Sequence, residues 1–141
     1  MNEQQKPVKT PLEWIRFAEG DFRVAESNFE SDEPSYHTIC FLCQGAAEKF
    51  LKAYLISQGW ELEKTHDIIE LLKACKTYKP DLSDMTQLGD VLNEYVIAGR
   101  YPGDLKSDEI GKAEAEEAIE ATRAIRMRVM ELMAKPNDLS S

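Results

Sequence analysis

The spacing of apolar residues constrains the fold more than any other feature of this sequence. Apolar side chains recur three and four positions apart almost throughout the chain, which is the period of an amphipathic α-helix. No stretch alternates apolar and polar residues between the turn signals that mark a β-hairpin. Because 141 residues are enough for one core, the sequence predicts a single all-α domain, an up-and-down bundle of about five helices joined by short connections.

Local start and stop signals set the expected helix boundaries. Thr10 and Glu13 match a capping box with Pro11 at the first helical position. Gly59 closes the second helix, and Thr65 is expected to cap the third. The expected helices cover residues 11 to about 30, about 35 to 58, 65 to about 78, 81 or 83 to 97, and about 107 to 134. Residues 11–135 thus form the bundle, between a flexible N-terminus at 1–10 and a flexible tail at 136–141.

The first and last helices each carry an apolar stripe that predicts which face is buried. In the first helix, the expected buried stripe consists of Leu12, Trp14, Phe17, Ala18, Phe22 and Ala25. In the last helix it consists of Ala115, Ala118, Ile119, Thr122, Ile125, Val129 and Leu132.

Charge and hydropathy exclude two classes of protein. The chain has 17 basic and 26 acidic residues and a net charge of -9, so a nucleic-acid contact needs a local basic patch and a general DNA-coating role is excluded. Its apolar runs are far too short to cross a bilayer, and the N-terminus has no apolar signal region. We therefore expect a soluble, cytoplasmic protein with no membrane partner.

The three cysteines favour structural roles. Cys40 and Cys43 form a Cys-x-x-Cys, but inside an apolar helical run and not at the strand-to-helix turn that thioredoxin-type chemistry uses. A zinc site would need a further ligand beside Cys75, with His37 or His66 the only imidazoles in the chain. Buried reduced thiols are preferred over a metal or redox site, and no metal or cofactor is expected.

The second helix has a mixed face that suggests an interface. An arc of this helix combines an aromatic ring, a mid-helix glycine and alternating charges, which a purely solvated face does not require. We expect this face to form a homodimer interface around a twofold axis. The alternative is a solvated surface on which Glu48 and Lys52 form an ordinary ion pair four residues apart. The expected interface residues are Phe41, Gln44, Gly45, Glu48, Lys49 and Lys52.

Four segments in one order resemble a known family. They are a first helix that contains a tryptophan, "QGAAEKFLKAYLISQG", "THDIIELL" and "AGRYP". Together, over roughly residues 12 to 130, they resemble the HEPN domain family. The resemblance implies an up-and-down helical bundle that commonly dimerises. It also implies either a partner role beside a small nucleotidyltransferase, often as a toxin-antitoxin pair, or a metal-independent ribonuclease.

The ribonuclease motif of that family is absent. Its nuclease members carry an arginine followed, after four to six residues, by a histidine that moves the proton of the ribose 2'-hydroxyl. Arg100 matches the arginine, but Leu105, Lys106 and Ser107 occupy the histidine positions, and no histidine follows His66.

Arg100 therefore has three interpretations. It ends a helix before the Tyr101-Pro-Gly turn, or it binds a phosphate while Tyr101 stacks on a base, or it works with His66 in catalysis. We expect a nucleotide- or RNA-binding component that acts with a small nucleotidyltransferase, using Arg100, Tyr101, Lys49 and Lys52. The alternatives are a ribonuclease toxin with a displaced histidine, using Arg100 and His66, and a dimeric adaptor without a ligand.

Overall fold

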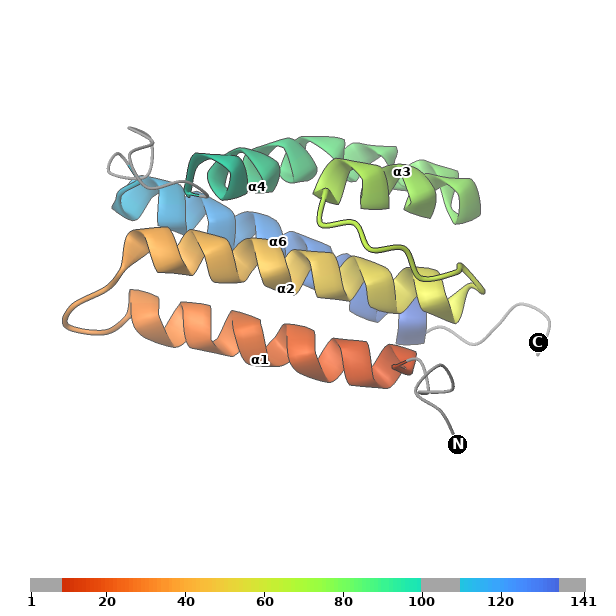
Figure 1. Cartoon of the computed structure of the whole chain (residues 1–141), viewed down its shortest axis with the longest axis horizontal. Coiled ribbons are helices and arrows are strands. Elements are labelled where there is room, and N and C mark those ends of the chain that lie inside the picture. The colour runs from red at the N-terminus through yellow and green to blue at the C-terminus, as the bar shows by residue number, and fades with distance from the viewer. Residues whose placement is uncertain (1–8, 100–109, 135–141) are drawn as a thin grey trace.

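The computed structural model is all-helical in the part of the chain that it describes, which is residues 9–99 and 110–134, with side chains described for residues 9–94 and 110–134. Within these residues, the elements in chain order are α1 (Pro11–Phe29), α2 (Tyr36–Ser57), α3 (Ile68–Tyr78), the 3-10 helix η2 (Pro80–Met85), α4 (Thr86–Gly99) and α6 (Lys112–Ala134). Figure 1 shows long helices that run up and down beside one another. The predicted all-α bundle is confirmed.

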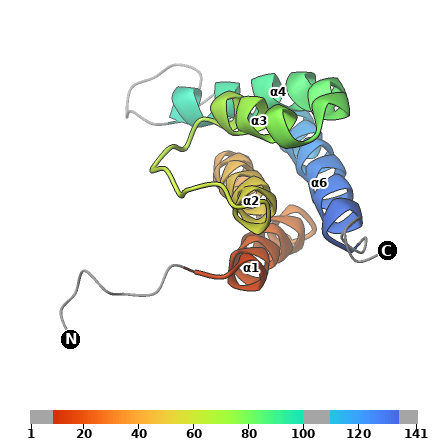
Figure 2. The same ribbon diagram turned by 90° about the vertical axis from the view of Figure 1, so that its right-hand side faces the viewer.

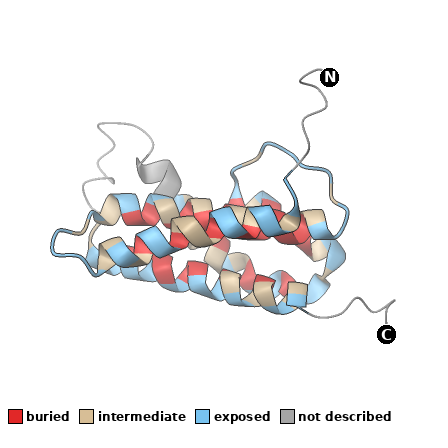
Figure 3. Ribbon diagram, turned by 90° about the horizontal axis from the view of Figure 1, so that it is seen from below, coloured by how far each residue is buried: buried red, intermediate tan, exposed pale blue. Residues whose placement is uncertain are grey.

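The second helix forms the centre of the bundle. Seen end-on, α2 lies between α1 on one side, α6 on a second side and the α3–α4 pair on a third (Figure 2). Its buried residues lie all around the helix from Cys43 to Leu55, so it has almost no solvated face in this stretch. On the other helices, buried positions form stripes that point inward (Figure 3).

Helix α1 begins where its capping signals predict but buries a different face. The Thr10 hydroxyl accepts from the Glu13 N–H at 3.2 Å, and the Glu13 carboxylate accepts from the Thr10 N–H at 2.8 Å. The expected stripe is wrong in part, because Leu12 is 76% exposed and Phe17 is 49% exposed. The residues that face the core of the bundle are spaced three and four apart, and they are Ile15, Ala18, Phe22 and Ala25.

The end of α2 follows the predicted glycine stop. Gly59 adopts a φ of 93°, the left-handed region in which a side chain would be strained. The N–H groups of Gly59 and Trp60 donate to the carbonyls of Ile56 and Leu55, each at 3.0 Å, which is the Schellman pattern. The chain then runs back along α2 as the irregular segment 60–67 (Figure 1).

Three helix starts differ from the sequence prediction. The fourth helix, expected from residue 81 or 83, begins as α4 at Thr86, because Pro80–Met85 form the 3-10 helix η2. Asp67, and not Thr65, caps α3, because its carboxylate accepts from the N–H groups of Ile69 and Glu70. Helix α6 begins at Lys112 and not near residue 107. There the Glu114 carboxylate accepts from the backbone N–H of Gly111 at 2.8 Å, as in a capping box.

The core is completed by thiols and by one close helix contact. Cys40, Cys43 and Cys75 are free and fully buried, and burial raises the pKa of each thiol to about 12, which confirms the prediction of core cysteines. Gly89 of α4 lies so close to α3 that an added Cβ would be 2.7 Å from the Leu72 Cδ1 atom. Among the described residues, no helix is both long and apolar enough to cross a membrane.

Candidate functional site

A groove on the α1–α2 face contains every described residue that the sequence assigns to a binding or interface role. This α1–α2 groove has a volume of about 780 Å³. Helix α1 contributes Trp14, Phe17 and Asp21 to its walls, and Lys9 and His66 flank it. From α2 come the predicted residues Phe41, Gln44, Gly45, Glu48, Lys49 and Lys52. Residues predicted for several different roles therefore share one site.

A buried ion pair forms the floor of the groove. The Lys52 ammonium lies 2.8 Å from the Glu48 carboxylate, and the two side chains are only 4% and 11% exposed. The same ammonium lies 5.5 Å from the centre of the Trp14 ring, within cation–π range. This pair is therefore not a solvated surface pair, because both side chains are buried within the protomer. Each charge has the other as its ion-pair partner there.

Glu48 also holds His66. The Nδ1 atom of His66 lies 2.9 and 3.1 Å from the two carboxylate oxygens of Glu48. Because a carboxylate only accepts, Nδ1 carries the proton and Nε2 of the neutral ring keeps its lone pair. The side-chain amide of Gln44 donates to the backbone carbonyl of His66 at 2.6 Å, which fixes the main chain at the same point. The imidazole itself is 70% exposed, so the ring is accessible from the groove.

Gly45 lies beside an ion pair between the two helices. The Lys49 ammonium lies 2.6 Å from the Asp21 carboxylate, and each side chain is 30% exposed. A Cβ on Gly45 would lie 3.4 Å from the Asp21 carboxylate and 3.6 Å from the Lys49 nitrogen, which are ordinary contact distances. The mid-helix glycine thus faces α1 within the protomer, with space for a methyl group.

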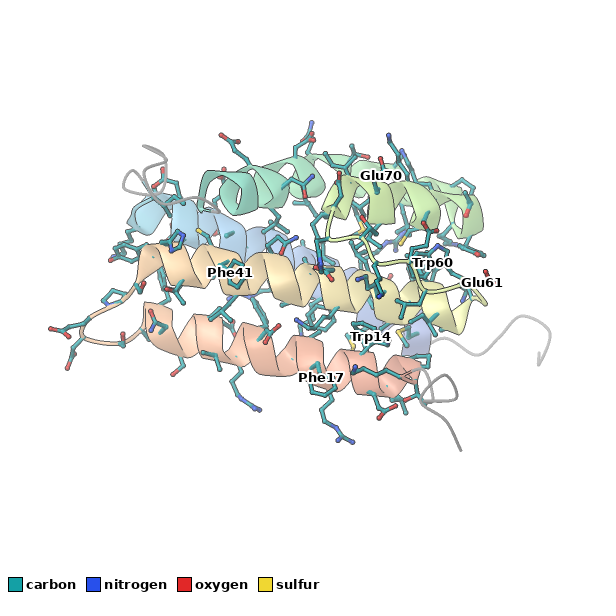
Figure 4. The ribbon with its side chains drawn as sticks, in the orientation of Figure 1. Trp14, Phe17, Phe41, Trp60, Glu61 and Glu70 are labelled. Carbon is teal, nitrogen blue, oxygen red and sulfur yellow. The ribbon has the colours of Figure 1, made fainter. Side chains whose placement is uncertain are left out.

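Aromatic rings are exposed along the groove. Phe41 is 61% exposed and Phe17 is 49% exposed, and Figure 4 shows both, with Trp14, on the face that α1 and α2 share. The Lys9 ammonium lies 5.5 Å from the ring centre of Trp14 and 5.7 Å from that of Phe17. Three lysines and two carboxylates line the groove, and Lys49 and Lys52 are each paired with one of those carboxylates. Lysines therefore exceed carboxylates by one here, in a chain of net charge -9.

The structure divides the expected dimer face into two parts. Gln44, Glu48 and Lys52 are buried and have partners within the protomer. Phe41 is exposed, and Lys49 is partly exposed. The homodimer remains a prediction, and only the second part is open to a partner. Arg100 and Tyr101, the other predicted binding residues, lie outside the described residues.

The sequence prediction misses the contribution of α1 to the groove. It assigns Phe17 to the core, although at 100° per residue this ring lies far from the Ile15 and Ala18 stripe and next to Trp14. That offset is the signal that places Phe17 on a second face, with Trp14 at the border between this face and the buried stripe. Among the described residues, no three histidine, cysteine or acidic side chains gather as metal ligands would.

Comparison with known families identifies the domain that carries this groove. The family model of the HEPN domain matches residues 12–132 of the chain. The chain belongs to the HEPN family. Among curated proteins, none matches its sequence.

Solved structures support the same family. An archaeal HEPN homologue, ST0689, is 27% identical with a TM-score of 0.71, over 89% of this chain and 98% of its own. The protein TT1696 from Thermus thermophilus is 26% identical with a TM-score of 0.70, over 86% and 96% of the two chains. The similarity extends over most of this chain, and every residue of the groove except Lys9 lies within the range that the family model matches.

Proposed function

We propose that this HEPN protein is a cytoplasmic nucleotide- or RNA-binding component that acts with a minimal nucleotidyltransferase in a toxin-antitoxin-like pair. The observation that carries the binding role is the α1–α2 groove, which places ammonium groups and exposed aromatic rings side by side. Phosphates are bound by cations, and bases stack on ring faces. The groove also has one more lysine than carboxylates, and a local excess of positive charge favours an anion in a chain that is acidic overall.

The groove residues have separate tasks in this proposal. Lys49 and Lys9 are accessible enough to contact a phosphate. Lys52 is buried and acts through Glu48, whose carboxylate positions the imidazole of His66 at the groove. Arg100 and Tyr101, which follow α4 in the sequence and lie outside the described residues, would add a guanidinium and a ring. The nucleotidyltransferase partner and the homodimer rest on membership of the family, in which both are common.

A titration of the purified protein tests the binding role. We expect nucleotides or a ten-nucleotide single-stranded RNA to bind the wild type, and Lys49→Gln and Arg100→Ala to weaken binding about tenfold each, which is the scale of one lost charged contact. Lys73→Gln is the matched control, because this lysine is 65% exposed on α3 and does not line the groove. If the wild type binds none of these ligands, the binding role is refuted and the adaptor role remains. If Lys73→Gln weakens binding as much as Lys49→Gln does, the effect comes from the change in net charge and not from the groove.

Co-purification tests the partner. The proposal predicts that a small nucleotidyltransferase encoded beside this protein binds it when the two are co-expressed, and that they elute together. Separate elution of two folded proteins would remove the two-component role and leave the binding role untouched.

The Glu48–His66 contact favours a second candidate, a metal-independent ribonuclease with a displaced histidine. In that reaction Nε2 of His66 takes the proton of a ribose 2'-hydroxyl, and the freed oxygen attacks the adjacent phosphorus. The bond to the 5'-oxygen breaks, and that oxygen leaves with a proton, which the imidazolium can return. Arg100 would stabilise the phosphate as charge builds on it. RNA cleavage by the wild type that is lost in both His66→Asn and Arg100→Ala would support this candidate. RNA that the wild type binds but leaves intact would contradict it.

A further inference from the structure

We infer that the ligand of the α1–α2 groove is a single strand of nucleic acid several nucleotides long, bound through ring faces and phosphates with little selection for base or sugar. This inference rests on the proposed binding function and narrows it in two ways. It separates a strand from a mononucleotide, and it predicts that DNA binds about as well as RNA.

The first support is the distribution of exposed rings. Phe17 comes from α1 and Phe41 from α2, and they occupy different places along the groove (Figure 4). Both rings are about half exposed or more in the protomer. Separate ring faces along one groove match the way in which single-strand-binding proteins stack successive bases. A mononucleotide has one base and occupies only one of them.

The second support is the position of the charges. Lys9 lies over the rings of Trp14 and Phe17, and Lys49, which is paired with Asp21 and 30% exposed, lines the same groove. A strand that stacks on the rings therefore brings its phosphates near ammonium groups. Lys52 is excluded from this role because it is 4% exposed and paired with Glu48.

The third support concerns the groups that would otherwise read a base or a ribose. The carboxylate of Glu48 is engaged by Lys52 and His66, and the amide nitrogen of Gln44 donates to the His66 carbonyl. The carboxylate of Asp21 is engaged by Lys49. The two carboxylates and the Gln44 amide nitrogen are thus occupied within the protomer. The exposed imidazole of His66 stays open to a base or a ribose, but it offers only one further nitrogen, while rings and ammonium groups accept any base and either sugar.

A second copy of the chain fits the groove less well. An isologous contact would place one groove against the same groove of the partner. Each groove has one more lysine than carboxylates, so the contact would bring two surfaces with the same sign of excess charge together. A polyanionic strand complements that charge instead.

Fluorescence anisotropy with labelled ten-nucleotide oligo(U) and oligo(dT) tests the inference. We expect the two to bind within about threefold of each other, and Phe17→Ala and Phe41→Ala each to weaken binding about tenfold, the low end for one stacked base. AMP should compete about tenfold less well than the strand or worse, since it uses one ring. Two accessible lysines predict a slope of about -1.4 for log K against log salt, and Lys9→Gln should reduce it by about 0.7.

Tyr78→Ala is the matched control, because this ring is 40% exposed but lies outside the groove. Urea unfolding of each variant confirms that it is folded before its binding is compared. The inference requires that Tyr78→Ala binds like the wild type.

The other outcomes overturn the inference. If Phe17→Ala and Phe41→Ala bind as well as the wild type, the ligand binds elsewhere. The proposed binding function would then still hold, but not at this groove. Preference for AMP over the strand would also keep that function and remove the inference. If Phe17→Ala or Phe41→Ala converts a dimer to a monomer with unchanged binding, the rings belong to an interface between copies. Absence of binding by the wild type to every probe would refute the inference and the binding function together.

Discussion

The buried Glu48–Lys52 pair predicts a strongly non-additive pattern of stability. In Glu48→Leu, the Lys52 ammonium stays 4% exposed and loses its carboxylate partner, so only the Trp14 ring, 5.5 Å away, opposes the cost. Breaking a buried pair costs about 3 to 5 kcal/mol, and the cation–π contact offsets part of it, so we expect a loss of about 3 kcal/mol. In Lys52→Met, Glu48 keeps its contact with His66, so we expect a smaller loss in the free energy of unfolding, about 2 kcal/mol.

The double variant Glu48→Leu/Lys52→Met is the decisive member of the cycle. It removes both charges and fills the space with apolar side chains, an exchange that often changes stability little. We therefore expect its free energy of unfolding to lie within about 1 kcal/mol of that of the wild type. Urea unfolding followed by circular dichroism measures all four proteins. The exposed pair Glu70–Lys73 is the control, with losses below about 0.5 kcal/mol. A double variant that loses the sum of the two single losses would refute the argument that the charges depend on each other.

Three further predictions concern helix packing, pH and the thiols. Gly89→Ala should destabilise the protein by about 1 to 3 kcal/mol, because its Cβ would meet Leu72 at 2.7 Å. Gly20→Ala should stabilise it by about 0.5 to 1 kcal/mol, because the new Cβ has no neighbour within 4 Å. Thermal unfolding compares the two variants. Hydrogen bonds from the Asn93 amide and the first N–H groups of α3 lower the pKa of Asp67 below its ordinary 3.8. Their stabilisation is present above that value and is lost as pH falls through the lower folded pKa, so Asp67→Asn should flatten the acid limb of the stability curve. The three buried thiols, with a pKa of about 12, should react with a thiol reagent at pH 8 only after unfolding; rapid labelling of the native protein would contradict their burial.

Local signals in the sequence predict most of the fold. The capping box at Thr10 and the stop at Gly59 act within a few residues, so the first two helices have nearly the predicted bounds. Competing local signals explain the errors. Asp67 is a stronger cap than Thr65, and Glu114 caps α6 at Gly111 although the sequence offers acidic residues earlier.

Long-range contacts explain why the site is predicted only in part. The arc of mixed residues on α2 is visible in the sequence, but the partner of Glu48 is His66, 18 residues away in another segment. Likewise, the neighbours of Gly45 include Asp21, which comes from α1. Sequence spacing within one helix carries no information on which neighbour covers it, so an intramolecular network resembles a dimer face.

The most direct test of the α1–α2 groove as the binding site is an NMR titration of the labelled protein with a ten-nucleotide single-stranded RNA. The account predicts that the indole signal of Trp14 and the amide signals of Gly45, Lys49 and His66 shift together and saturate at one ratio. The indole of Trp60, which lies outside the groove, should stay unchanged and serves as an internal control. The account would be contradicted if the signals of Trp14, Gly45 and Lys49 stay unchanged while saturable shifts cluster on another face of the protein.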